Sequence, residues 1–236
     1  MRRDDPDSGA LAAVEPLPGT PEQVFAALEP MISAERLARV DAVVAQRTRS
    51  VVPVLEAVDD PRNVAAILRS ADALGVQEVH LIEGAQPFLA SRRITQGAER
   101  WLDLRRHPSP EAAVAALREK GFRVYVATMQ GDAAPVDLRS LPKVALVFGN
   151  EQSGASERLL AACDGRCTIP MRGFAQSLNV SVAAALALYE LTRERAGDLD
   201  PRDRAELRAR FLMLSVERAT EVVAEHVSRA ASAQSR

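Results

Sequence analysis

Four small polar residues lie directly before the most apolar helical stretch of the chain: Gln176, Ser177, Asn179 and Ser181. One Ser or Asn is enough to cap a helix, because its side-chain oxygen accepts a hydrogen bond from an N–H group that the first turn leaves unpaired. The additional polar groups, together with the positive end of the helix dipole, are typical of a ligand site. Both interpretations stay open at this point: a cap alone, or a cap combined with a binding site.

Two further polar loops follow predicted strands late in the chain. One reads GNEQSG over 149–154, and the other reads IPMRGF over 169–174. The first strand-to-helix turn reads EAVDDPRNVAAILRS from residue 56 and has no glycine. A Rossmann-type nucleotide site carries G-x-G-x-x-G at that turn. The sequence therefore predicts ligand loops late in the chain and argues against an ordinary Rossmann cofactor site.

The helix after this first turn carries two arginines on one side. Asp60 and Pro61 predict where the helix begins, and Gly75 predicts where it ends. Arg62 and Arg69 are seven residues apart, so they lie on one side of the helix, roughly opposite its apolar face. On periodicity alone, two solvated arginines are the plainer interpretation. A functional role for the two arginines requires a partner surface that covers them.

These residues are positioned by an alternation of short strands and helices that begins near residue 51. Apolar β-rich runs predict strands over 51–58, 76–84, 101–107, 123–129, 143–149 and 166–171. Apolar or amphipathic runs predict helices over 60–75, 109–121, 156–165 and 178–197. The alternation indicates an α/β fold with a mostly parallel sheet and helices on both faces.

Helical extensions flank this α/β region. Residues 1–19 are rich in Pro, Asp, Gly and Ala and are expected to be a disordered tail. Thr20 and Ser33 predict the caps of two helices within an N-terminal extension, 20–50. The central domain spans 51–197. The C-terminal extension, 198–236, is expected to hold one amphipathic helix from about Asp203 to Arg229, whose apolar side is marked by Leu207, Phe211 and Leu214. These three residues need burial, which is a reason to expect a homodimer.

Composition restricts the class of protein. The chain has 236 residues, of which 47% are hydrophobic, and a net charge of −2, so it is typical of a globular protein without a global basic field. Cys163 and Cys167 form a lone C-x-x-x-C, which is no zinc framework, and no metal is expected. No apolar run approaches a membrane span or a signal sequence, so the expected location is the cytoplasm, without membrane association.

Basic residues gather in two local segments that are candidate RNA contacts. On the helix after Ser33, three arginines share one side: Arg36, Arg39 and Arg47. The segment 91–107 holds five arginines, Arg92 and Arg93 among them, against Glu99 and Asp103. A basic, glycine-containing loop can follow a phosphate backbone. The plainer interpretations are a solvated helix face and an exposed strand edge.

Three segments resemble, in order, the motifs of the SpoU/TrmH family of AdoMet-dependent RNA ribose 2′-O-methyltransferases, in the SPOUT class. They read NVAAILRSADA from Asn63, FGNEQSG from Phe148 and IPMRGFAQSLNVS from Ile169. The third is the most specific, because QSLNVS before an Ala-rich helix does not arise easily from composition. The resemblance extends from about Ser33 to about Leu214 and is greatest to the TrmH tRNA methyltransferases. One position departs: many TrmH proteins have His before the first-motif Asn, where this chain has Arg62.

The resemblance implies a SPOUT fold with a deep trefoil knot in its C-terminal part and a homodimer built around that knot. It also implies that S-adenosyl-L-methionine (AdoMet) is held largely by backbone groups of the late loops. The positions that match the family's cofactor site are Phe148, Gly149, Asn150, Ile169, Met171 and Leu178. Those that match its catalytic positions are Asn63, Arg69, Glu151, Ser177 and Asn179.

The chemistry suits these residue types. A ribose 2′-hydroxyl is a poor nucleophile, so methyl transfer requires alignment and at least partial deprotonation. We expect Arg69 to hold an RNA phosphate and stabilise developing alkoxide charge; action as a general base, assisted by a phosphate, is the alternative. Glu151 is expected to shape its loop or orient Arg69. Ser177 and Asn179 are expected to position cofactor and ribose, with loop packing as the competing role for Ser177 and Glu151.

The resemblance also implies a substrate: the ribose 2′-hydroxyl of guanosine 18 in the tRNA D-loop. Basic residues spread over several elements suit a folded tRNA gripped at many phosphates. The alternatives are another tRNA position, ribosomal RNA, and a non-catalytic RNA-binding or assembly protein. The matching residues at the catalytic positions argue against the last, since such a protein has no need of them.

Overall fold

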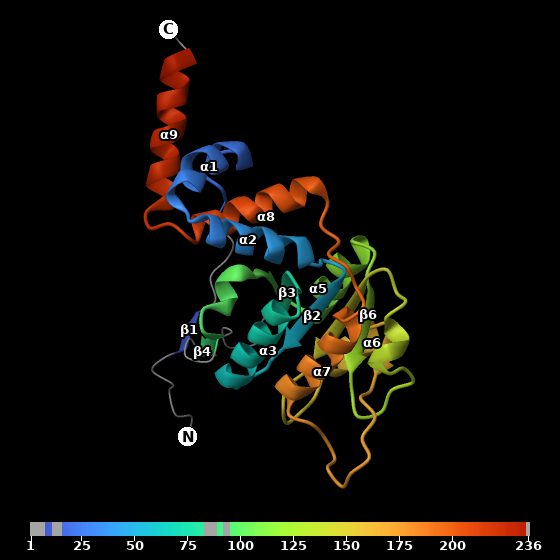
Figure 1. The fold of residues 1–236 in the computed structure, drawn as a ribbon. Coiled ribbons are helices and arrows are strands. Elements are labelled where there is room, and N and C mark those ends of the chain that lie inside the picture. Colours follow the sequence, from blue (N-terminus) through green and yellow to red (C-terminus); the bar gives the residue numbers. More distant parts are fainter. Residues whose placement is uncertain (1–7, 11–15, 83–88, 92–94, 235–236) are drawn as a thin grey trace. The chain divides into compact units, whose positions relative to one another are not determined.

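The structure is a computed structural model that describes residues 8–10, 16–82, 89–91 and 95–234 (Figure 1). Arg92 and Arg93, and the greater part of the expected N-terminal tail, lie outside the described residues. The chain divides into two compact units. The first contains Thr48–Arg195 and the strand Ser8–Ala10; the second combines the segment that ends at Arg47 with the segment that begins at Ala196.

A six-stranded sheet forms the centre of the first unit. Its strands are β2 (Val51–Glu56), β3 (Glu78–Ile82), β5 (Asp103–His107), β6 (Arg123–Ala127), β7 (Val144–Phe148) and β8 (Gly165–Cys167). Their order is β5-β3-β2-β7-β6-β8, and every pair is parallel. The predicted parallel sheet is therefore confirmed. Strands β2 and β7 are buried along their whole length, as expected for the centre of a parallel sheet.

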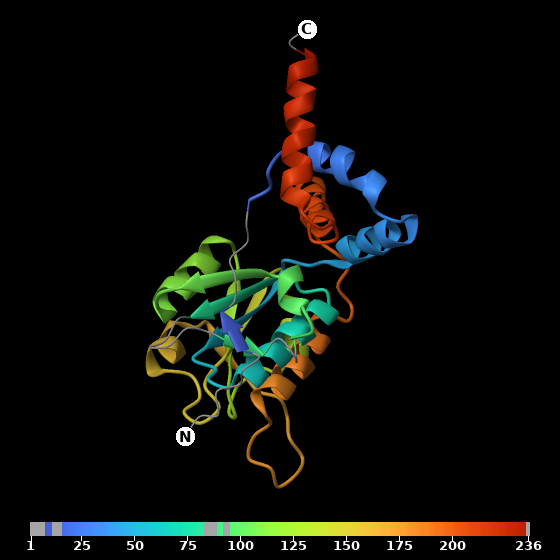
Figure 2. The same ribbon diagram turned by 90° about the vertical axis from the view of Figure 1, so that its left-hand side faces the viewer.

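Helices cover both faces of this sheet, as predicted (Figure 2). On one face, α3 (Pro61–Ala73) and α7 (Val180–Thr192) contribute Leu68 and Leu188 to a core that also contains Leu55 of β2. On the other face, α5 (Pro110–Glu119) and α6 (Glu157–Ala162) pack on a second core that contains Val54. The alternation of side chains along β2 thus divides its residues between two hydrophobic cores.

Side-chain caps begin the helices that flank the sheet. The Asp60 carboxylate accepts a hydrogen bond from the Arg62 N–H at 2.9 Å, and Pro61 occupies the first helical position of α3. Ser109 and Ser156 cap α5 and α6 in the same way. The predicted start of α3 is therefore confirmed. Two 3-10 turns, η2 (Ala98–Trp101) and η3 (Pro135–Leu138), complete the unit together with a short two-stranded sheet.

That two-stranded sheet was not predicted. Strand β1 (Ser8–Ala10) pairs antiparallel with β4 (Leu89–Ser91). Ser8–Ala10 falls within the segment 1–19 that the composition indicated to be disordered. Three residues with little β propensity gain strand structure here from a partner about 80 residues away, and local composition carries no information on such a partner.

The second unit is helical. It contains α1 (Pro21–Leu28), η1 (Glu29–Met31), α2 (Ala34–Gln46), α8 (Pro201–Met213) and α9 (Ala219–Gln234). Thr20 and Gln23 form the predicted capping box, and Ser33 caps α2. The expectation of one long helix from Asp203 to Arg229 was wrong. The helix ends at Met213, and Arg218, with a φ of 54°, adopts a left-handed conformation that a right-handed helix cannot contain.

Two further expectations for this unit need correction. Leu207 and Phe211 are 1% and 2% exposed, because α8 packs against α1 and α2, so they need no second chain to cover them. Arg47 does not share an exposed face with Arg36 and Arg39. It lies just beyond α2 with an extended backbone, where helical periodicity no longer applies, and its guanidinium is buried 5.6 Å from the centre of the Phe211 ring.

Two features are absent from the part of the chain that the structure describes. No helix there is both long enough and apolar enough to cross a bilayer. No group of three or more His, Cys, Asp or Glu side chains there is arranged to hold a metal ion.

Candidate active site

Three side chains from distant segments form a continuous hydrogen-bonded chain. The Asn63 side chain donates from Nδ2 to Oε1 of Glu151 at 2.8 Å, and Asn179 donates from Nδ2 to Oδ1 of Asn63 at 3.1 Å. Asn63 lies in the first turn of α3, Glu151 in the loop after β7, and Asn179 immediately before α7. Because β2 and β7 are parallel neighbours, the segments that follow them meet at one edge of the sheet, which is where α/β proteins bind ligands. We call this chain the asparagine–glutamate network.

Glu151 ties the loop after β7 to the start of α3. Besides Asn63, its carboxylate accepts hydrogen bonds from the backbone N–H groups of Asp59 at 3.2 Å and Asp60 at 3.4 Å. Of the two roles expected for Glu151, this geometry fits the shaping of the loop. No contact joins Glu151 to Arg69 within the described part of the chain.

Asn179 serves as helix cap and as link at the same time. Its Oδ1 accepts from the Ser181 N–H at 2.9 Å, from the Ser181 hydroxyl at 2.6 Å and from the Val182 N–H at 3.4 Å. Its Nδ2 remains for Asn63. Since α3 and α7 pack together, this link joins the N-terminal ends of both helices, whose dipoles present partial positive charge at the site.

The loop after β7 is a tight turn that only glycine permits. Asn150 and Gly154 exchange two backbone hydrogen bonds of 3.0 Å, and Asn150 Oδ1 accepts from the N–H groups of Gln152 and Ser153. Asn150 also donates from Nδ2 to the Ala57 carbonyl at 2.9 Å. A Cβ at Gly149 would lie 2.4 Å from the Ala155 nitrogen, so any side chain there would displace the turn.

Sequence reasoning missed Glu56, which anchors the far end of this loop. Its carboxylate is buried at the end of β2 and accepts from the Ser156 N–H at 2.8 Å and the Ser156 hydroxyl at 2.6 Å. Ser156 in turn caps α6. The available signal was an acidic residue that ends an otherwise apolar strand, since a buried carboxylate requires partners.

The residues expected to hold the cofactor lie on two loops and one strand end. Phe148 is buried in the core, and Ile169 is partly buried against it. Met171 and Leu178 are 39% and 36% exposed, on the loop between β8 and α7. This loop extends away from the sheet in both views (Figures 1 and 2).

Arg69 and Ser177 do not join the asparagine–glutamate network. Arg69 is exposed on α3, six residues and about 9 Å beyond Asn63 along the axis, and its guanidinium has no partner among the described residues. Ser177 is exposed on the loop before α7. Arg62 pairs with Asp60 at 2.9 Å, and its hydrogen bonds to that carboxylate lower the pKa of Asp60. Within one chain, the structure therefore brings together three of the five expected catalytic residues.

Comparison with known proteins assigns a family to this arrangement. Residues 50–189 match the model of the SpoU rRNA Methylase family. The tRNA (guanosine(18)-2′-O)-methyltransferase of Thermus thermophilus is 40% identical over 163 residues, which are 68% of this chain and 83% of that protein. The structure of the A. aeolicus TrmH/SpoU tRNA modifying enzyme superposes with a TM-score of 0.68 at 27% identity, over 77% of this chain and 97% of that one.

A second solved structure concerns the cofactor. The SpoU methyltransferase AviRb from Streptomyces viridochromogenes, in complex with AdoMet, matches with a TM-score of 0.55 and 29% identity over 65% of this chain and 60% of that one. The family model covers more than half of the chain, including the asparagine–glutamate network. The chain therefore belongs to the SpoU/TrmH family of methyltransferases.

Proposed function

We propose that the protein transfers the methyl group of AdoMet to the ribose 2′-hydroxyl of guanosine 18 in tRNA. The observation that carries this proposal is the asparagine–glutamate network, which joins residues of all three family motifs at one edge of the sheet. The relative from Thermus thermophilus carries the same activity in its name and spans most of the chain.

The late loops fit AdoMet. The turn 149–154 and the loop 168–179 offer backbone polar groups, and Met171 and Leu178 present apolar surface that no core residue covers. A Cβ at Gly173 would meet no atom within 4 Å, so the loop backbone there is open to a ligand. An adenosine-like ligand needs this combination of apolar contact and backbone hydrogen bonds. When bound, AdoMet supplies an electrophilic methyl group.

The residues of the chain then have distinct roles. Asn63, Glu151 and Asn179 hold the loops and the two helix N-termini in a fixed arrangement. A guanidinium is a strong donor of hydrogen bonds to phosphate and to oxygen anions, so we assign Arg69 to binding an RNA phosphate and to stabilising the negative charge that develops on the ribose oxygen. Ser177 is assigned to positioning the cofactor or the ribose.

The exposure of Arg69 supports a homodimer in which it serves the site of the other subunit. The expected reason for a dimer, exposed apolar residues on α8, no longer holds. Helix α7 supplies another, because Val182, Leu186 and Tyr189 are 47%, 49% and 54% exposed at i, i+4 and i+7. Such an apolar stripe is typical of a helix that packs against a partner.

Substitution of this stripe tests the dimer. We expect Leu186→Glu combined with Tyr189→Glu to give a monomer by light scattering and to abolish methyl transfer, with the fold retained because both side chains are already exposed. Met31→Glu, at a similarly exposed apolar residue of the second unit, is the control and should leave the dimer intact. A wild-type protein that is monomeric at micromolar concentration and fully active would contradict the dimer.

The proposal also includes the trefoil knot, the domain limits 51–197 with extensions 20–50 and 198–236, and a cytoplasmic location, where tRNA is processed. The knot is supported by the course of the chain after β8. Thr168 is hydrogen-bonded to the Ala133 carbonyl near the edge of the sheet, and eleven residues later Asn179 binds Asn63 beside the central strand β2. Arg36, Arg39 and Arg62 are exposed and are proposed RNA contacts. Arg92 and Arg93, outside the described residues, are proposed RNA contacts from the sequence alone.

Transfer of labelled methyl from AdoMet to unmodified tRNA, followed by mapping of the product, tests the function. Label should appear on the ribose of guanosine 18 and disappear when that nucleotide is replaced. A chelator should leave turnover unchanged. Label in the anticodon loop or only in ribosomal RNA would contradict guanosine 18 as the substrate but would agree with ribose 2′-O-methylation as the reaction. Absence of AdoMet binding in calorimetry would overturn the reaction itself.

A further inference from the structure

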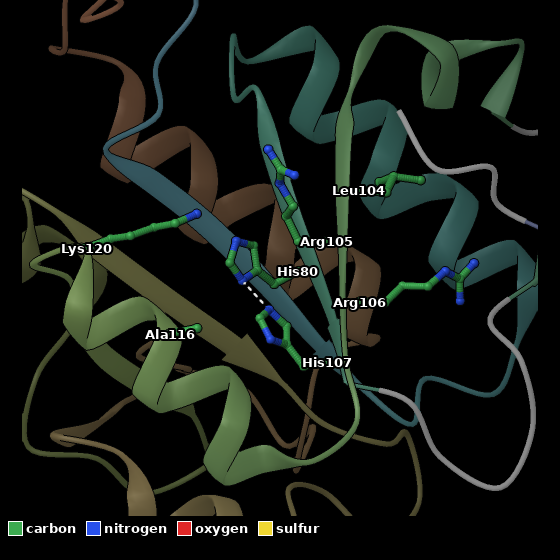
Figure 3. A pocket seen from close by; sticks show the side chains of 7 residues that line it. All are labelled: His80, Leu104, Arg105, Arg106, His107, Ala116 and Lys120. Carbon is green, nitrogen blue, oxygen red and sulfur yellow. Dashed lines mark hydrogen bonds between the residues drawn. The ribbon is translucent and has the colours of Figure 1, made fainter. Parts of the chain in front are cut away.

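A cavity of about 340 Å³ lies along β5, away from the three family motifs (Figure 3). Residues 104–107 line it together with His80, Ala116 and Lys120. Successive side chains of a strand point to opposite faces, so a cavity lined by four consecutive residues must pass over the strand's edge. Strand β5 is one of the two edge strands of the six-stranded sheet. Figure 3 shows Arg105 and His107 on the side of His80 and Lys120, with Leu104 and Arg106 on the other.

Four of the lining residues, His80, Arg105, His107 and Lys120, gather around the buried Glu78 carboxylate, and we call these five residues the histidine cluster. Glu78 Oε1 lies 2.8 Å from His80 Nε2, and His80 Nδ1 lies 2.8 Å from His107 Nε2. Lys120 donates from Nζ to Glu78 Oε1 at 2.9 Å, and Arg105 Nε lies 3.6 Å from the same oxygen. Burial raises the pKa of Glu78, but the hydrogen bonds from His80 and Lys120 outweigh burial and lower it to about 2. The carboxylate is therefore ionised at neutral pH.

The cavity has an excess of positive charge. Two cationic side chains, Arg105 and Lys120, face the single carboxylate of Glu78, and Arg106 lines the cavity from the other side of the strand. The Arg105 and Lys120 side chains are about half exposed, so their remaining N–H groups are accessible from the cavity. Arginine and lysine donors beside each other are the usual protein partners of phosphate oxygens. The volume is ample for a phosphate group and part of its ester.

We propose that this cavity is a phosphate-binding site and that a backbone phosphate of the RNA substrate occupies it. RNA as the source rests on the proposed function; the phosphate chemistry rests on the charges and volume of the cavity alone. The cavity is close enough to the asparagine–glutamate network for one RNA to reach both. The network lies at the end of β2, and β5 is two strands from β2, a separation of about 10 Å at ~4.8 Å per strand.

His107 provides a direct reporter of occupancy. Burial first, and then the electrostatic effects of His80 and Lys120, lower the pKa of His107 to about 4, so His107 is neutral at pH 7. The titratable and charged groups near it are Glu78 and His80 on β3, Arg105 on β5 and Lys120 at the end of α5. A phosphate beside these cations adds negative charge, which must raise the pKa of His107.

The first arm of the test is a titration of the whole protein with inorganic phosphate at constant ionic strength. The NMR signals of the histidine rings are monitored during the titration. The chain has only three histidines, and His226 on α9 lies outside the cluster and serves as the internal control. Saturable shifts of His80 and His107, with a raised pKa of His107 and no change at His226, are expected. Histidine signals that do not respond to phosphate would overturn the site.

The second arm identifies the source of the phosphate. Arg105→Gln combined with Lys120→Gln keeps two polar side chains at exposed positions, whereas Arg158→Gln removes a charge on α6 that pairs with Glu111 instead. We expect the double variant to lose the phosphate response and to bind tRNA about tenfold more weakly, with a salt dependence reduced by about one to two phosphate contacts, and the control to change neither. Loss of the phosphate response with unchanged tRNA affinity would overturn the RNA source and leave a site for a free phosphate compound. Failure of the wild type to methylate tRNA would overturn the proposed function without affecting the first arm.

Discussion

The asparagine–glutamate network and the histidine cluster are built alike but lie in opposite environments. Both are chains of side-chain hydrogen bonds that join elements far apart in the sequence. Glu151 and Asn179 are exposed at the ends of loops, whereas Glu78 and His80 are 6% and 1% exposed within the sheet. The first network lies where strands end and ligands can enter. The second joins the paired strands β3 and β5 to the end of α5.

The difference in burial predicts different consequences of substitution. Water can replace a lost partner in an exposed network, so the cost is mainly loss of geometry at the site. A buried carboxylate that loses a partner costs stability and makes that stability depend on pH. We therefore expect substitutions in the asparagine–glutamate network to change mainly turnover, and substitutions in the histidine cluster to change mainly the free energy of unfolding.

The largest effect is expected at Arg69, which belongs to neither network and is exposed on the same helix as Asn63. Arg69→Ala should lower turnover by at least about a hundredfold, because the variant lacks the charge that we propose to stabilise the transition state. The thermal midpoint and AdoMet affinity should change little, since the side chain has no described partner to lose. Steady-state methylation, calorimetry with AdoMet and a thermal melt measure the three quantities. Near-normal turnover would remove Arg69 from catalysis, and an unfolded variant would indicate a structural role.

The next effect compares two glycines in the loops that we propose to bind AdoMet, the turn 149–154 and the loop 168–179. Gly149→Ala should lower stability by roughly 2 kcal/mol or more and weaken AdoMet binding, because its Cβ would overlap the Ala155 nitrogen and the Gly154 carbonyl. Gly173→Ala is the matched control, since its Cβ meets no atom within 4 Å. It should leave the thermal midpoint unchanged. Equal stability of the two variants would show that the turn 149–154 is not as tight as the structure has it.

A smaller effect separates the two duties of Asn179. Asn179→Asp keeps an oxygen to cap α7 but removes the donor to Asn63, so turnover should fall by about tenfold with stability changed by less than about 0.5 kcal/mol. Asn179→Ala loses both contacts and should in addition lose about 1 kcal/mol of stability. Unchanged turnover in Asn179→Asp would mean that the link to Asn63 does not position the site.

The smallest effect concerns the pH dependence of the histidine cluster. The pKa of His107, about 4 in the folded chain, lies below its ordinary value of 6.5, so the unfolded chain binds the proton more readily. Its contribution to stability is complete above pH 6.5 and decreases as the pH falls towards 4. Glu78 affects stability at lower pH. Its contribution is present above its ordinary pKa of 4.5 and is lost as the pH falls towards 2.

His107→Gln isolates the upper of these two windows. Between pH 7 and pH 4.5, the thermal midpoint of the wild type should fall by a few degrees more than that of the variant. Below pH 4.5 both should decline together through Glu78. Parallel curves over the whole range would show that His107 titrates alike in the folded and unfolded chain.

The sequence by itself determined the features that depend on short segments. Asp60 with Pro61, Ser33 and Thr20 with Gln23 mark helix starts, because a cap acts over three residues. The alternation of strands and helices indicated the parallel sheet, because the connection between parallel strands must be long enough for a helix. The three motifs indicated the family, because each match depends on individual residues within one short segment.

Only the tertiary structure decided what depends on distant partners. The link between Asn63 and Glu151 spans 88 residues, and that between Asn63 and Asn179 spans 116. No local pattern states that β2 and β7 are neighbours, that Arg47 is buried on Phe211 or that Ser8–Ala10 pairs with Leu89–Ser91. These contacts form because folding selects the arrangement of lowest total free energy, and packing against a remote segment outweighs local propensities of a few tenths of a kcal/mol.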